Sequence, residues 1–143
     1  MRKGIASSAS PSTRQVNTTP IALDLTKPDK SKIKTWTEYD DGLIVKEYSS
    51  KEGRNISSVV TGEVEVWSAS GDGEECTFVQ SYAKEDSILV TVLVRNNGHC
   101  TEKYFEKVNG TWSSISEEEF LKEFYEMRMS GLLSNTASSK TYQ

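Results

Sequence analysis

The sequence has few of the residues from which reactive sites are built, since it contains one histidine and two cysteines in 143 residues. Cys76 and Cys100 are too few for a disulfide scaffold and lack the Cys-x-x-Cys spacing of zinc and redox sites. His99 lies beside the Asn97-Gly98 turn, where we expect it to be solvated. No nucleophile, base and orienting group can be assembled around it. The sequence therefore predicts no enzyme activity, no cofactor and no metal ion.

Basic charge and long apolar runs are also scarce. Lys and Arg together number 17 against 21 for Asp and Glu, which gives a net charge of −4 and argues against nucleic acid or anionic lipid as a partner. No segment approaches the roughly 20 apolar residues that span a bilayer. Residues 1–19 are rich in Ser and Thr and nearly free of apolar residues, so we expect a disordered leader rather than a signal peptide.

The sequence does contain one segment that is apolar on both faces of an extended strand, Ser87 to Arg95. Ile88, Val90, Val92 and Val94 alternate with Leu89 and Leu93. Because successive side chains of a strand point to opposite faces, this pattern predicts a central strand that is buried on both sides.

Short alternating segments separated by turn residues surround this strand. Asp41-Gly42, Asn97-Gly98 and Asn109-Gly110 supply the positive φ angles that tight hairpins need. Gly62 separates two further strand-like segments. Pro20 precedes the first strand-like segment of the chain, which begins at Ile21. The expected architecture is α+β and mainly β, an antiparallel bent sheet or half-barrel of about seven to eight short strands.

After Ser116 the apolar period changes from that of a strand to that of a helix. Ser116 and Glu119 form a capping box, and an apolar stripe is expected to dock the helix on the sheet. The stripe comprises Phe120, Leu121, Phe124, Tyr125 and Met129. Gly131 is expected to end the helix. We therefore predict one domain over residues 20–130 and a flexible tail over residues 131–143.

The two cysteines begin strands that are expected to flank the central strand. In a simple meander they lie two strand spacings apart, about 9.6 Å, beyond the roughly 7 Å that a disulfide tolerates between Cα atoms. The geometry favours two free thiols at Cys76 and Cys100.

Three other kinds of site deserve a test. Trp36, Trp67 and Trp112 are large enough to line a ligand cavity or face a partner, although tryptophans are more often core residues. The acidic turns at Asp40-Asp41 and at Asp72 with Glu74-Glu75 do not match a calcium loop. Glycosylation acceptor patterns occur at the following asparagines: Asn17, Asn55 and Asn109.

The order of these segments resembles the FAINT domain, the module "frequently associated in Theileria". The resemblance rests on Ile21 to Leu25, on Val59 to Gly62 followed by Trp67, on the acidic loop at Asp72 to Glu75, and on Asn109 to Trp112 before the acidic helix start. It implies a parasite protein that is secreted or exported toward the host cell. The family has no established enzymatic activity and no defined active site, so no functional residue is carried over.

Together these observations predict a non-enzymatic interaction module with an unidentified host protein as its partner. Two alternatives stay open. The first is a carrier of a small apolar ligand in a cavity of the curved sheet, and the second is a surface antigen without a defined partner.

Overall fold

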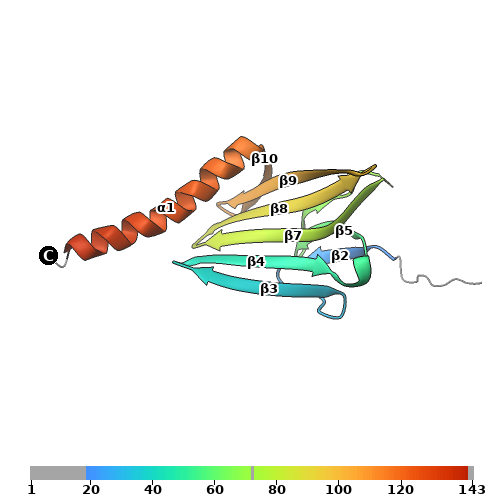
Figure 1. Cartoon of the computed structure of the whole chain (residues 1–143), viewed down its shortest axis with the longest axis horizontal. Helices are drawn as coiled ribbons and strands as arrows, with labels where there is room; N and C mark the ends of the chain where they lie inside the picture. The colour runs from blue at the N-terminus through green and yellow to red at the C-terminus, as the bar shows by residue number, and fades with distance from the viewer. Residues whose placement is uncertain (1–18, 72, 142–143) are drawn as a thin grey trace, which may run out of the picture.

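A computed structural model of the chain describes residues 19–71 and 73–141, with side chains as far as residue 129. These residues form nine strands, one short 3₁₀ turn and one helix, against the seven or eight strands expected (Figure 1). The fold class is the predicted one, α+β and mainly β. The elements are β2 (Ile21–Asp24), β3 (Ile33–Asp40), β4 (Leu43–Ser50), η2 (Lys51–Gly53), β5 (Ile56–Thr61), β6 (Val64–Ser68), β7 (Glu74–Lys84), β8 (Ser87–Asn96), β9 (His99–Val108), β10 (Thr111–Ile115) and α1 (Glu117–Thr141).

The larger sheet has six antiparallel strands in the order β10-β9-β8-β7-β4-β3. Its hairpins are the ones that the turn residues predict. Both residues have positive φ angles in the turns Asp41-Gly42, Asn97-Gly98 and Asn109-Gly110. Strand β8 pairs with β7 and β9 along its length, so the predicted central strand is confirmed.

The smaller sheet has three strands in the order β2-β5-β6. Its β2–β5 pair is parallel, whereas the sequence predicts an antiparallel arrangement. The strands are thus divided between two sheets rather than forming one continuous bent sheet. The division follows from burial, because Leu23, Ile56 and Val59 are fully buried and need a layer to face.

The smaller sheet supplies that layer by packing on one face of the larger sheet. Val90, Val92 and Val94 of β8 join Leu23 and Val59 in one core cluster between the sheets. The opposite face of β8 contributes Leu89 to a second, smaller cluster with the helix. Each face of the central strand therefore serves a different core.

Helix α1 begins as the capping box predicts. The Glu119 backbone N–H donates to Ser116 Oγ at 3.1 Å, and the Ser116 N–H donates to Glu119 Oε1 at 3.1 Å. Phe120 and Met127 are buried against the sheet, and Phe124 packs beside them. Leu121 and Tyr125, which the apolar stripe placed on the sheet, are 54 % and 63 % exposed.

The helix turns Phe120, Phe124 and Met127 toward the sheet, at a spacing of four and then three residues, and this leaves Leu121 and Tyr125 outside. It also continues through Gly131 to Thr141, so the predicted end at Gly131 is wrong. A glycine inside a helix costs only about 0.5–1 kcal/mol relative to alanine, and such a cost is tolerated.

The segments predicted to flank the domain lie only partly within the described residues. The expected leader lies outside them except for residue 19, and the flexibility of the tail stays a prediction. Within the described part of the chain, no helix combines the length and apolar character needed to cross a membrane.

Candidate functional site

Helix α1 covers only part of the second face of the larger sheet (Figure 1). The part that the helix leaves uncovered is the candidate functional site. Cross-strand pairing aligns Trp36 with Glu47 and Glu47 with Gln80 in one row. The adjacent row, two residues along each strand, pairs Phe78 with Leu93. We call this surface the open face; it comprises Lys34, Trp36, Glu47, Ser49, Phe78, Gln80, Leu93 and Glu102.

Phe78 and Leu93 form the centre of the open face. Both side chains are half-buried, and they occupy neighbouring strands directly opposite each other. Trp36 lies toward the β3 edge and is 51 % exposed. An apolar centre with an exposed tryptophan nearby is the arrangement found in protein–protein interfaces, where aromatic anchors supply much of the binding energy.

Polar side chains around this centre are held by hydrogen bonds to one another. Tyr82 Oη donates to Gln80 Oε1 at 2.7 Å, and Gln80 Nε2 donates to Glu47 Oε2 at 3.0 Å. Tyr104 Oη donates to Glu102 Oε1 at 3.2 Å. The rim of the open face is therefore ordered before any partner arrives.

The electrostatics of the open face favour a basic partner. Burial raises the pKa of Tyr82, and the charges of Glu102 and Glu47 raise it further, so the phenol remains protonated and donates to Gln80. Glu47 and Glu102 flank the apolar centre, and the basic side chains on the same face are Lys34 of β3 and Arg95, two residues beyond Leu93 on β8. Acidic groups around an apolar centre suit a segment that combines basic and apolar residues.

The three tryptophans named by the sequence do not meet in one site. Trp67 is 8 % exposed and belongs to the core between the sheets. Trp112 packs at the margin of the same core, where its indole N–H is buried without a hydrogen-bond partner. Only Trp36, among the three, lies on the open face.

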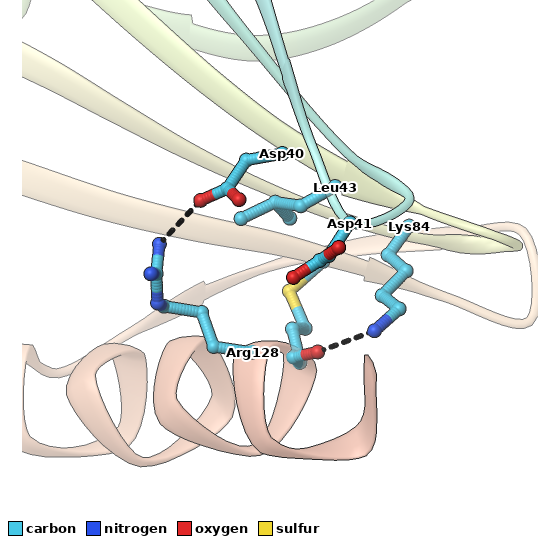
Figure 2. A pocket seen from close by; sticks show the side chains of 6 residues that line it. Asp40, Asp41, Leu43, Lys84 and Arg128 are labelled. Atoms are coloured by element: carbon cyan, nitrogen blue, oxygen red, sulfur yellow. Dashed lines mark hydrogen bonds and ion pairs between the residues drawn. The ribbon is translucent and has the colours of Figure 1, made fainter. Parts of the chain in front are cut away.

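Figure 2 shows a second place where charged groups gather, between the β3–β4 turn and α1. Arg128 Nη1 lies 3.2 Å from Asp40 Oδ2, and Lys84 Nζ donates to the Met127 carbonyl oxygen at 2.8 Å. The hollow between them holds about 40 Å³, far below the several hundred Å³ of a small-molecule pocket. These contacts fasten the helix to the sheet and leave no room for a substrate.

Two larger hollows open directly to solvent. One, of about 360 Å³, is lined by Lys34, Thr35, Trp36, Glu47 and Ser49. The other, of about 680 Å³, contains Leu93, Glu102 and Tyr104 among its lining residues. They lie on the two sides of the open face, and neither is the enclosed apolar cavity that a carrier requires.

The remaining sequence candidates are spread over several elements. His99 and Cys100 are exposed at the start of β9, while Cys76 is buried in the core. No three His, Cys, Asp or Glu side chains converge as a metal site in residues 19–71 and 73–141. The backbone N–H of Cys76 donates to Asn55 Oδ1 at 2.9 Å, and Asn109 holds a tight turn. Asn17 and Asp72 lie outside the described residues.

Comparison with protein families identifies the chain. The model of the FAINT domain, described as a domain of unknown function (DUF529), matches residues 22–100, more than half of the sequence. The chain belongs to the FAINT family. No curated protein and no solved structure matches it significantly.

The FAINT match extends from β2 to the first residues of β9, so it contains both layers of the core and most of the open face. Trp36, Glu47, Phe78, Gln80 and Leu93 all lie inside it. Glu102, strand β10 and helix α1 lie beyond its end. The FAINT region thus supplies most of the open face, while the segment that follows it supplies Glu102 and the helix that limits this face.

Sequence reasoning missed every open-face residue except Trp36. Phe78 and Leu93 look like core residues in the sequence, because nothing local shows that the helix stops short of them. The sequence carries a signal at Glu47 and Gln80, because each adjoins a core residue on its strand, Tyr48 and Val79 respectively, as on a strand with one face in water.

Proposed function

We propose that the chain is a non-enzymatic protein-interaction module whose partner docks on the open face. The observation that carries this proposal is the half-buried Phe78–Leu93 centre beside exposed Trp36, with a rim of hydrogen-bonded polar groups. A partner segment with an apolar anchor and flanking basic residues would bury Phe78 and Leu93 and pair with Glu47 and Glu102.

The resemblance to exported parasite proteins supports a setting for this module. In that setting the protein is secreted or exported toward the host cell, and the partner is a host protein.

The proposal is tested by affinity capture from host-cell lysate with the full chain and two charge-reversal variants. Glu47→Lys with Glu102→Lys reverses the rim of the open face. Glu63→Lys with Glu65→Lys makes the same charge change on exposed positions of the smaller sheet. A protein captured by the wild type is then purified, and its affinity for each variant is measured by calorimetry.

We expect the open-face variant to bind at least about tenfold more weakly, because each lost rim contact with a charged partner is worth roughly 1 kcal/mol or more. The smaller-sheet variant should bind as the wild type does. Equal affinities for all three proteins would place the partner elsewhere and refute the open face as its site.

A further inference from the structure

Strand β3 forms one edge of the larger sheet, and its outer side has no neighbouring strand (Figure 1). Its eight residues pair with β4 without a register shift, whereas the opposite edge strand β10 has five residues. The strand contains no proline and no bulge. Natural proteins usually protect long regular edges with such features, because free N–H and C=O groups are a template for another strand.

The hydrogen-bond pattern defines how much of this edge is free. Lys51 N–H donates to the Lys32 carbonyl at 2.8 Å, so residues of even number in β3 face β4. The backbone groups of Thr35, Thr37 and Tyr39 therefore point outward. Ile33 also points outward, but its N–H already donates to the Asp29 carbonyl at 2.9 Å. The free edge is centred on Thr37.

We infer that this edge joins β3 of a second copy of the chain, antiparallel and with the two-fold axis at Thr37. The two six-stranded sheets would then form one continuous sheet, with both helices on the same side. Residues opposite each other would exchange about six backbone hydrogen bonds, two in each of three pairs. Such an interface is isologous, as in most homodimers.

The side chains of β3 complement themselves in this register. Lys34 lies opposite Asp40 of the second copy, and Thr35 lies opposite Tyr39. Thr37 meets its own copy. Opposite charges, an aromatic next to a β-branched residue, and paired threonines are the cross-strand pairs that stabilise antiparallel sheets.

The neighbouring registers are less favourable. An axis at Trp36 would bring Tyr39 of the second copy against Ile33, where the Asp29 turn already occupies the edge. An axis at Glu38 would place the two Glu38 side chains opposite each other, and like charges in that position destabilise the pair. Both the free backbone groups and the charges of β3 therefore favour a two-fold axis at Thr37.

Cysteine cross-linking tests the register in the full chain with Cys100→Ser, because Cys100 is exposed and Cys76 is buried. Thr37→Cys places two thiols across the axis, where Cα atoms are about 5.5 Å apart and a disulfide fits. The matched control Thr35→Cys lies on the same strand and face, but the Cα atoms of its two copies are about 14 Å apart. Mild oxidation should link most of the first variant and little of the second.

Sedimentation of the same background without added cysteines tests the association itself. One strand pair buries less area than a permanent dimer, so we expect dimers at concentrations on the order of 100 µM. Thr37→Pro removes an outward N–H without touching a bond to β4 and should abolish the dimer. Thr37→Val keeps that N–H and should retain it.

Equal cross-linking of the two cysteine variants would overturn the register. A chain that stays monomeric at every concentration, or a folded Thr37→Pro variant that still dimerises, would overturn the inference. If Thr37→Pro does not fold, as judged by circular dichroism, the cross-linking comparison decides. The inference is independent of the proposed function, because the Glu47 and Glu102 substitutions leave the β3 edge intact and Thr37→Pro leaves the rim charges in place.

Discussion

At the scale of single residues, the two cysteines show how burial sets chemistry. Both thiols are free, as the strand geometry predicts. Cys76 is 1 % exposed, and burial raises the pKa of its thiol to about 11. Cys100 is exposed on the other side of β8. The same functional group is therefore protected in one strand and accessible in another.

We expect one thiol of the native protein to react with an alkylating reagent at pH 8. A thiol with a pKa of about 11 is about one-thousandth thiolate at that pH, and the thiolate is the reactive form. Mass spectrometry should find one modification in the folded protein and two in urea. Cys100→Ser should leave the folded protein unmodified, and rapid modification of Cys76 in that variant would contradict its burial.

The directions of the Cys76 and Phe78 side chains could not be predicted from the sequence. Strict alternation would point Cys76 and Phe78 to the same face. A bulge between them turns Cys76 into the core and Phe78 onto the open face. No local feature of residues 76–78 announces this bulge, because its position depends on how β7 meets β8.

At the scale of elements, the hairpins were predictable and the sheet partition was not. Asn-Gly and Asp-Gly turns act on adjacent strands, so local sequence determines those pairs. The parallel pairing of β2 with β5 joins segments separated by the whole β3–β4 hairpin, and only burial of their apolar faces selects it. The candidate site was unpredictable for the same reason, since it is defined by where α1 ends its contact with the sheet.

The start of α1 gives the first prediction about an element. Ser116→Ala removes the side-chain oxygen that accepts the Glu119 N–H. We expect the free energy of unfolding to fall by about 1 kcal/mol, the usual cost of losing such a cap. Urea denaturation measures the change. Ser114→Ala, at an exposed strand position two residues earlier, is the control, and an equal loss in both variants would show that the cap contributes nothing specific.

The stability of the contact between α1 and β9 is expected to depend on pH through Glu106. Burial raises the pKa of Glu106, and Glu123 and Glu119 of the helix raise it further. The Glu106 carboxylate therefore binds a proton more tightly in the folded chain than in the unfolded chain. The stability attributable to Glu106 should increase as the pH falls through the raised pKa, and level off below the ordinary glutamate value.

Glu106→Gln should remove this dependence. We expect the variant to be more stable than the wild type at pH 7 by about 0.5 kcal/mol, a value reduced for solvent screening. The difference should vanish below the ordinary glutamate pKa. Urea titrations at several pH values measure it, with Glu65→Gln on the smaller sheet as the control. A variant that is less stable at pH 7 would reverse the sign and contradict the argument.

At the scale of the whole molecule, the chain is layered, with the smaller sheet packed on one face of the larger sheet and the helix on the other face. The cluster between the sheets unites buried residues from both sheets, whereas the helix cluster has four: Leu43, Leu89, Phe120 and Met127. The β3–β4 turn fastens the helix through the exposed Asp40–Arg128 pair, and such pairs contribute little. The helix layer should therefore open more easily than the sheets.

Native-state hydrogen exchange tests this order of opening. We expect amides of α1 to exchange through an opening at least about 2 kcal/mol below that of β8 amides, because the helix can leave while the sheets stay packed. Phe120→Ala removes helix packing that both opened states lack, so it should lower both opening free energies by about 3 kcal/mol. Val92→Ala weakens the inter-sheet core, which survives helix release, so it should lower only the β8 value, by about 2 kcal/mol. If Val92→Ala lowered both values equally, the helix and the sheets would unfold as one unit, and the open face could not widen without loss of the whole fold.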